Sequence, residues 1–276
     1  MLTEEIGAFA VHLKENEKSA ATAEKYCRDA AAFAAFVGDQ ELNRELVIGY
    51  KQYIVEKGYA ARSVNSMLAS VNSFLEFLGR QDCRVKALKL QRQVFCSEEK
   101  ELTKAEYLRL VDAAKMKGNG RLALVIQTIC GTGIRVSELR FITVEAAKRG
   151  EAVVNCKGKT RTVFLVKELR KKLLRYCAEQ GIKAGYIFIT KTGKPMNRTC
   201  VWREMKNLCR QARVSPSKVF PHNLRHLFAR TFYGIEKDIA KLADILGHSS
   251  IDTTRIYIIS TGTEHRRRME HMRLVI

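Results

Sequence analysis

The 276-residue sequence has few features of a membrane, secreted or metal-binding protein. No stretch approaches the roughly 18 consecutive apolar residues that cross a bilayer, and Glu4 and Glu5 precede the first apolar stretch, where a signal peptide would be basic. The eight cysteines include no CxxC pair, whereas zinc sites need closely spaced ligands and disulfide frameworks belong to small secreted domains. We therefore expect reduced, mostly buried thiols in a cytoplasmic protein with no membrane segment and no metal.

Acidic residues are fewer than basic ones, and the difference is confined to one part of the chain. The chain carries 49 Lys+Arg against 29 Asp+Glu, a net charge of +20, and all of this excess lies after residue 90. With 46% hydrophobic residues the chain can bury a core, so it is not a disordered basic tail. The basic residues are spread along 91–276 rather than gathered in one amphipathic helix, which disfavours a membrane surface as the partner. The asymmetry predicts two domains, of which the second binds a polyanion.

Proline is also rare, with three in the whole chain, and this fits a mostly helical protein. Residues 1–80 contain four helical patterns and no strand pattern. The last three of these helices follow Ser19, Asn43 and Ser63 as N-caps and are closed by Gly38, Gly58 and Gly79. We predict a helical bundle over 1–88 and a linker over 89–97.

The remainder, 98–276, is predicted to be a second domain, mainly helical with a small β-sheet. A capping box at Thr103 and Glu106 opens its first helix, and the apolar run Arg121–Cys130 predicts a buried helix. Two β-rich runs, 152–156 and 161–166, flank a Lys-Gly-Lys-Thr turn and predict a hairpin. The further helices are expected at 167–180, 197–212, 224–233 and 238–246.

Four short segments of the second domain could carry chemistry. They are Gly-Thr-Gly-Ile-Arg135-Val-Ser-Glu138, the hairpin turn with Lys157 and Lys159, His222-Asn-Leu-Arg225-His226, and Leu-Gly-His248 followed by Tyr257. Each has an ordinary alternative when taken alone, such as a helix cap, a solvated turn or a core tyrosine. His222 and His226 have the spacing of an HExxH zinc helix, but Asn223 replaces the required Glu, so a metalloprotease is not expected.

Taken together, these residues suit metal-free attack on a phosphodiester. Planar guanidinium groups bind the two nonbridging oxygens bidentately. A tyrosine hydroxyl, with a pKa of about 10, needs a base or a strongly cationic site to become a nucleophile. The leaving oxygen needs a proton donor, a role that suits a lysine on a hairpin.

The ordered segments are similar to the motifs of the tyrosine recombinase family, the phage integrases and Xer-type recombinases. GTGIRVSEL resembles the family's first arginine box, CKGKTR its hairpin lysine, HNLRH its His-x-x-Arg box, and LGHSSIDTTRIYI the segment that ends in the nucleophile. The pattern Ser19-xx-Thr22-xxx-Tyr26-xx-Asp29 resembles the family's N-terminal SAM-like, core-binding domain. The resemblance covers the whole chain. It implies a site-specific DNA recombinase with a helical DNA-clamping domain and a mixed α+β catalytic domain.

The resemblance also implies roles for individual residues. Tyr257 would be the nucleophile, forming a 3′-phosphotyrosyl link and freeing a 5′-hydroxyl. Arg135 and Arg225 would clamp the scissile phosphate, and Lys157 would protonate the leaving oxygen.

The other motif residues would assist that reaction. His222 would help to move the tyrosine proton, His248 would hydrogen-bond the phosphate, and Glu138 would orient the site. His226 is expected to be structural. No cofactor is implied, because the covalent intermediate conserves the bond energy without ATP or a metal.

The motifs depart from the family pattern at three places. The hairpin turn is about one residue short, so Lys159 competes with Lys157 as the general acid. Phe164 stands where the family usually has proline. In the fourth helix, three polar residues stand where relatives often carry Arg: Asn65, Ser66 and Asn72. This suggests that the neutral first domain binds phosphates weakly.

The expected partners are double-stranded DNA and further copies of the chain, forming a tetramer on two DNA sites. A partner recombinase or accessory protein is possible, and the tail around Arg266 is a candidate for docking onto a neighbouring subunit. Action on DNA places the protein at the nucleoid. Two other functions stay open: a type IB topoisomerase, which relaxes supercoils as a monomer, and a catalytically silent DNA-binding regulator.

Overall fold

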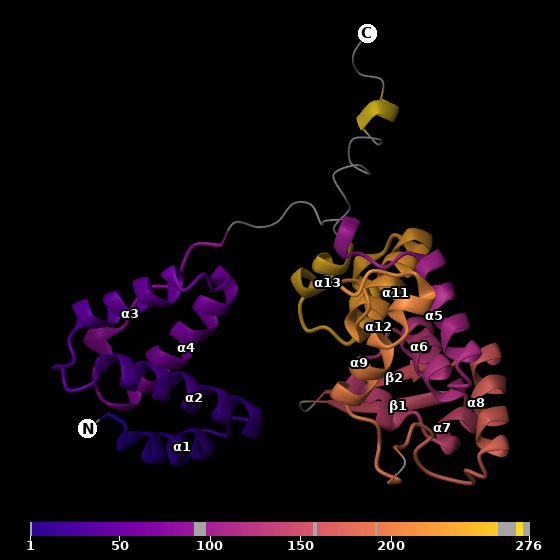
Figure 1. Ribbon diagram of the computed structural model, residues 1–276, viewed down its shortest axis with the longest axis horizontal. Coiled ribbons are helices and arrows are strands. Elements are labelled where there is room, and N and C mark those ends of the chain that lie inside the picture. The colour runs from indigo at the N-terminus through magenta and orange to yellow at the C-terminus, as the bar shows by residue number, and fades with distance from the viewer. Residues whose placement is uncertain (1, 91–97, 157–158, 191, 259–268, 273–276) are drawn as a thin grey trace. The chain divides into compact units, whose positions relative to one another are not determined.

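A computed structural model describes residues 2–90, 98–156, 159–190, 192–258 and 269–272 of the chain. The chain divides into two compact units, Met1–Arg92 and Gln93–Ile276, and each is described by itself (Figure 1). Most of the predicted linker, 89–97, lies outside the described residues. The predicted fold class, mainly helical with a small sheet, is confirmed.

The first unit is a bundle of four helices followed by a short 3-10 turn. Its elements are α1 (Glu5–Glu15), α2 (Ala20–Val37), α3 (Arg44–Glu56), α4 (Ala61–Phe77) and η1 (Gln81–Cys83). The predicted caps Ser19 and Asn43 accept hydrogen bonds from the backbone N–H groups of the first turns of α2 and α3. The apolar faces meet in one core around fully buried Phe9, Phe33 and Phe74. The four predicted helices are confirmed, but the predicted cap Ser63 is wrong, since α4 begins at Ala61 and its N-cap is Ala60, three residues earlier.

Two asparagines of α4 hold the chain that follows the bundle. The Asn72 side chain exchanges two hydrogen bonds with the backbone of Val85, at 2.9 and 3.1 Å. Asn65 does the same with the backbone of Leu88, at 2.9 and 2.7 Å. Since the amides of these two residues already bind backbone groups, their presence where relatives often carry Arg has a structural reason.

The second unit contains the sheet and the remaining helices. Its elements are η2 (Glu98–Lys100), α5 (Lys104–Met116), α6 (Gly120–Thr132), η3 (Val136–Phe141), α7 (Val144–Arg149), β1 (Glu151–Cys156), β2 (Lys159–Phe164), α8 (Lys167–Glu179), α9 (Arg198–Lys206), α10 (Cys209–Ala212), α11 (Pro221–Glu236), α12 (Ile239–Leu246) and α13 (Ile251–Ile258).

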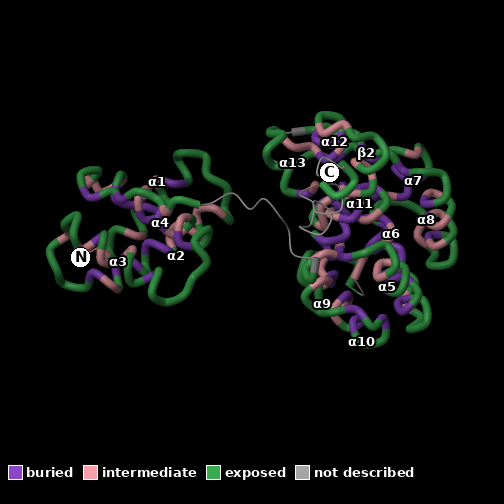
Figure 2. Tube along the Cα trace, turned by 90° about the horizontal axis from the view of Figure 1, so that it is seen from above, coloured by how far each residue is buried: buried purple, intermediate pink, exposed green. Residues whose placement is uncertain are grey.

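Helix α6 is the centre of this unit, as its apolar sequence predicts. Eight of its thirteen residues are buried, and it packs against α5, α8, α9 and α11 (Figure 2). Helix α5 begins with the predicted capping box, in which Thr103 and Glu106 bind each other's backbone N–H groups. A long buried helix held on several sides gives its C-terminal end a fixed position, and the first arginine box follows at that end.

The predicted hairpin is present as an antiparallel pair, with Glu151 opposite Phe164 and Cys156 opposite Lys159. Its inner face buries Ala152, Val154 and Val163 in the core. Phe164 is 72% exposed on the other face, so the substitution of the family's usual proline affects only the surface. Residues 157–158, at the turn, lie outside the described residues.

Two predicted helix boundaries are wrong. The single helix expected at 197–212 is divided into α9 and α10 by a turn at 207–208. The helix expected at 224–233 begins three residues earlier, at Pro221, because the fixed φ of proline suits the first helical position and its missing N–H is not needed there. His222 therefore lies on the first turn of α11, three residues before Arg225 on the same side of the helix.

None of the helices in the described parts of the chain is both long and apolar enough to cross a bilayer. Six of the cysteines, in the portions that the structure describes, are free thiols, and three of these are buried: Cys83, Cys177 and Cys209.

Candidate active site

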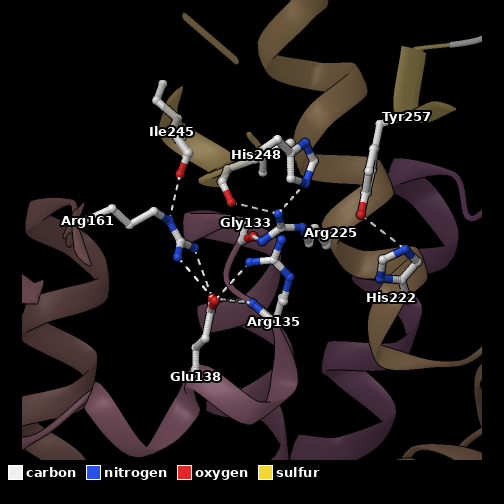
Figure 3. A network of polar contacts seen from close by, with 10 residues as sticks. Gly133, Arg135, Glu138, Arg161, His222, Arg225, Ile245, His248 and Tyr257 are labelled. Carbon is white, nitrogen blue, oxygen red and sulfur yellow. Dashed lines mark hydrogen bonds and ion pairs between the residues drawn. The ribbon is translucent and has the colours of Figure 1, made fainter. Parts of the chain in front are cut away.

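Four segments of the second unit converge on one polar cluster (Figure 3). They are the turn from α6 into η3, strand β2, the first turns of α11, and the segment from the end of α12 through α13. Together they bring two groups of contacting residues close to each other, the Arg135–Glu138 pair and the set of His222, Arg225, His248 and Tyr257. The charges of Arg135 and Glu138 act on Arg225. The sequence-predicted residues that the structure describes thus lie together.

Gly133 turns the chain from α6 toward Arg135. Its φ of +66° is left-handed, and a Cβ at this position would lie 2.4 Å from the Phe228 ring. The carbonyl of Gly133 accepts a hydrogen bond from Arg225 Nη1 at 2.6 Å. Glycine is therefore required both for the backbone conformation and for the close approach of α11.

We expect Gly133→Ala to destabilise the second unit by more than the roughly 1–2 kcal/mol of a left-handed alanine, because the added methyl group also overlaps Phe228. Gly131→Ala is the matched control, since Gly131 lies inside α6 and a Cβ there meets nothing within 4 Å. Alanine at that position should be neutral or stabilising by up to about 1 kcal/mol. Thermal denaturation of the two variants measures the difference, and equal melting temperatures would contradict this account of the turn.

Glu138 is a carboxylate that is 1% exposed and fully engaged. Oε2 accepts from the backbone N–H of Arg135 at 2.8 Å, and Oε1 accepts from the Arg135 side chain at 3.0 Å. Burial alone would raise its pKa, but hydrogen bonds from Arg161 and Arg135 more than offset burial and hold the pKa of Glu138 below its ordinary value. The carboxylate stays ionised and fixes the arginine beside it, while its orienting role in the reaction stays a prediction.

Arg161, on β2, is a member of the cluster that the sequence analysis missed. Its guanidinium pairs with both Glu138 oxygens, at 3.1 and 2.9 Å, and its Nε donates to the Ile245 carbonyl at 3.1 Å. The side chain also fills the space beside Gly247, where a Cβ would lie 2.6 Å from Arg161 Cδ. Arg161 thus joins the hairpin, the arginine box and the end of α12. The only sequence signal for it is the last letter of CKGKTR.

Arg225 is 1% exposed and spans the site. Besides Gly133, it donates from Nη2 to the Leu246 carbonyl and to His248 Nε2, both at 2.8 Å. Burial, and then the charge of Arg135, lower the pKa of Arg225 to about 10. Arg225 is still charged at neutral pH, so the site holds a desolvated cation beside the tyrosine ring, whose centroid is 5.7 Å from its Cζ.

His248 is held at both ring nitrogens. Nε2 faces Arg225, and Nδ1 lies 2.8 Å from the Thr254 hydroxyl oxygen. Thr254 is completely buried on α13. Burial, followed by the charges of Arg225 and Arg135, lowers the pKa of His248 to about 4, so the ring is neutral at physiological pH. Thr254 is the second residue of the cluster that the sequence analysis missed.

Tyr257 is 6% exposed and lies among histidines. Its hydroxyl is 3.2 Å from His222 Nε2 (Figure 3). His226 stacks on the Tyr257 ring with centroids 4.3 Å apart and meets His222 edge-on at 4.9 Å. Burial, and then Arg225 and Arg135, lower the pKa of His222, and the pKa of His226 falls to about 4. The tyrosine therefore contacts the neutral imidazoles of three histidines, and the charged arginines Arg225 and Arg135 lie close to them.

The predicted general acid, Lys157, lies outside the described residues. Lys159 begins strand β2 opposite Cys156. The choice between the two lysines therefore stays a prediction. Within the ranges that the structure describes, no three His, Cys, Asp or Glu side chains gather as they would around a metal ion.

Both units match known protein families. The profile described as the phage integrase family matches residues 100–264, and that of the phage integrase N-terminal SAM-like domain matches residues 6–82. The protein is of the class that cuts and rejoins DNA at specific sites through a tyrosine. The chain belongs to the phage integrase family, the tyrosine recombinases.

Within this family the chain is Xer-like. It is 28% identical to the tyrosine recombinase XerA of Pyrococcus furiosus over 228 residues, 79% of this chain and 77% of the relative. It is 34% identical to XerC of Bradyrhizobium diazoefficiens over 229 residues, 76% of this chain and 70% of the relative. The chain is thus a Xer-like tyrosine recombinase, and the predicted family and activity are confirmed.

Solved structures share the fold. A λ integrase dimer bound to a COC′ core site has a TM-score of 0.76 at 17% identity, with 95% of this chain and 96% of that chain covered. XerH bound to its difH substrate has a TM-score of 0.70 at 16% identity, with 96% and 83% covered. The predicted two-domain architecture, a SAM-like helical unit with an integrase catalytic unit, is therefore that of the family.

Proposed function

We propose that Tyr257 is the nucleophile of this recombinase. It would attack the scissile phosphate, form a 3′-phosphotyrosyl bond and release a 5′-hydroxyl, and the reverse attack by a 5′-hydroxyl would rejoin the strand. The observation that carries the proposal is the 3.2 Å contact between the Tyr257 hydroxyl and His222 Nε2 beside the buried guanidinium of Arg225. This supplies a base and a cation to a hydroxyl that is unreactive on its own.

His222 would accept the tyrosine proton. A histidine can do so only when neutral, and its lowered pKa keeps it neutral at physiological pH. Its place on the first turn of α11 sets the ring opposite the hydroxyl. The proton would thus pass from Tyr257 Oη to His222 Nε2 as the bond to phosphorus forms.

Arg135 and Arg225 would bind the nonbridging oxygens of the phosphate. The Arg135 side chain is 36% exposed, so it could reach a phosphate of bound DNA while Glu138 fixes its position. The buried Arg225 is already oriented by two backbone carbonyls, which lowers the cost of reorganisation as charge develops in the transition state. The lysine of the hairpin, Lys157 or its neighbour Lys159, would protonate the leaving 5′-oxygen.

The DNA partner and the assembly are taken from the relatives. λ integrase has been solved as a tetramer bound to a Holliday junction, and XerH bound to difH. We expect this chain to bind double-stranded DNA with both units, 1–88 and 98–276, and to form a tetramer on two sites, with or without a partner recombinase or accessory protein. Its substrate would place it on the nucleoid in the cytoplasm. The +20 charge supports a polyanionic partner.

A nicked suicide substrate carrying the candidate site tests this mechanism. When cleavage releases a short fragment with the 5′-hydroxyl, rejoining fails, and the full-length protein should accumulate as a covalent adduct whose modified peptide contains Tyr257. The adduct should form equally in EDTA, because the proposed steps use only side chains. An adduct at another residue, or its loss in EDTA, would overturn the proposal. Relaxation of plasmids lacking the site would favour the topoisomerase alternative.

A further inference from the structure

Three groups in the site form a chain of hydrogen bonds: the Arg225 guanidinium, the His248 ring and the Thr254 hydroxyl. We propose that Thr254 is a positioning residue that holds His248 in the tautomer protonated at Nδ1 and fastens the nucleophile's helix to the site. The proposal rests on the proposed function only for its effect on cleavage. The tautomer itself is a property of the free protein.

The direction of the hydrogen bonds follows from the chemistry of arginine. A guanidinium has donors and no acceptor, so Arg225 Nη2 donates to His248 Nε2 across 2.8 Å. Nε2 must then carry a lone pair instead of a proton. In a neutral imidazole the single proton is therefore on Nδ1, and it points to Thr254 Oγ1, also at 2.8 Å.

The surroundings keep the ring neutral. The charged or titratable groups that face His248 are Arg225, Arg135, Arg161 and His222, and the Tyr257 ring centroid is 5.2 Å from its own. A second proton on the ring would meet several positive charges in a half-buried position. Only the hydroxyl of Thr254, which is completely buried, offers an oxygen to Nδ1 among the hydrogen bonds of the described residues.

Thr254 also acts on the position of the nucleophile. It lies three residues before Tyr257 on α13, so both side chains project from the same side of that helix, and both are buried while Thr253 and Arg255 are exposed. The bond from His248 to Thr254 therefore ties α13 to the turn that follows α12. The hydroxyl of Tyr257 is held opposite His222 by the same attachment.

One consequence concerns the role of His248. In the free protein Nε2 accepts from Arg225, so the ring orients the guanidinium that is proposed to bind the phosphate.

The tautomer is measured by NMR on the full chain labelled with ¹⁵N-histidine, with His248 assigned by comparison with His248→Asn. The expected spectrum of the wild-type protein shows a neutral His248 with Nδ1 protonated and Nε2 unprotonated. Thr254→Ser keeps the hydroxyl and should keep this pattern. Thr254→Val keeps the shape but removes the acceptor, so the Nδ1 proton loses its hydrogen bond and the Nδ1 resonance should move; a ring that turns away from Arg225 as a result should also show a proton on Nε2.

Cleavage of the suicide substrate gives the second readout. Thr254→Val should slow adduct formation by roughly 10–100-fold, the effect of removing a hydrogen-bond partner behind a functional histidine. Thr254→Ser should stay within about threefold of wild type. Thr253→Val, on the exposed side of α13, controls for the substitution itself and should cleave like wild type.

Either of two results would overturn the proposal: an Nε2-protonated His248 in the wild-type protein, or Thr254→Val behaving like Thr254→Ser in both measurements. Should Thr254→Val fail to fold by circular dichroism, Thr254→Ala, which also lacks the hydroxyl, takes its place in both measurements. Failure of the proposed function is separate, because it would appear as an adduct that does not map to Tyr257 while the tautomer stands.

Discussion

Replacing Tyr257 with phenylalanine should abolish covalent attachment of the protein to DNA. The ring contacts that hold Tyr257, with His226 at 4.3 Å and His248 at 5.2 Å, can be kept by phenylalanine, so the site should stay packed. Only the oxygen proposed to form the phosphotyrosyl bond is removed. We expect adduct formation to fall by at least about 10³-fold, since no other group can replace a covalent nucleophile.

The measurement is denaturing electrophoresis of the suicide-substrate reaction, with DNA binding followed in parallel by mobility shift. Binding should stay within about twofold of wild type, because the basic residues are unchanged. Tyr233→Phe is the matched control: Tyr233 packs against the same small cluster as Tyr257, and loss of its hydroxyl should leave adduct formation intact. A covalent adduct formed by Tyr257→Phe would rule out this mechanism.

Replacing Glu138 with alanine should be the most damaging change to stability. Its carboxylate is 1% exposed and is paired with Arg135 and Arg161, so its removal leaves two arginines without their shared counter-ion in a buried place. Breaking a buried ion pair from one side costs about 3–5 kcal/mol. For a unit of this size the melting temperature should fall on the order of 10 °C.

Glu168→Ala is the control for this experiment. Glu168 is 72% exposed and pairs with Lys171 on the surface of α8, and such pairs contribute within about 1 kcal/mol. Differential scanning calorimetry of the two variants compares the buried carboxylate with the exposed one. A Glu138→Ala protein that melts with the wild type would show that the Glu138 network does not stabilise the fold.

The acid sensitivity of the fold should depend on the same carboxylate. The pKa of Glu138 is lowered from its ordinary value of 4.5, so its contribution to stability is fully present above that value and is lost as the pH falls through the folded-state pKa. Glu138→Gln has no such proton to take up, and its stability deficit relative to wild type should therefore shrink in acid.

The motif residues could be predicted because each lies in a short segment with a recognisable order, from Arg135 to Tyr257. Arg161 and Thr254 could not, because their roles come from what they touch. Arg161 is notable only once β2 brings it to Glu138, and Thr254 only once α13 brings it to His248. Which side chains contact the motif residues depends on distances in the folded chain, and a single sequence does not give those distances.

The fold was predictable to a similar depth. The bundle was predicted from the apolar periodicity of the first unit, and the central helix from the nearly uniform apolar run of α6. Both patterns show which helix faces are buried. Helix ends were less predictable, as the early start of α11 at Pro221 shows. The polar side chains of α4 resembled substitutes for phosphate contacts, whereas Asn65 and Asn72 bind the backbone that follows the bundle.

The position of Tyr257 has a further consequence for an assembly of several chains. Its hydroxyl meets His222 of the same polypeptide, and its ring is packed against His226 and Arg225 of the same unit. The tyrosine proposed as nucleophile and its proposed base therefore belong to the same chain, so we expect cleavage in cis. On this proposal, a complex of identical subunits would hold one such tyrosine, with its own histidine and arginines, in each chain. The order in which strands are cut would then depend on how neighbouring subunits activate or inhibit each site, because each site would use its own tyrosine.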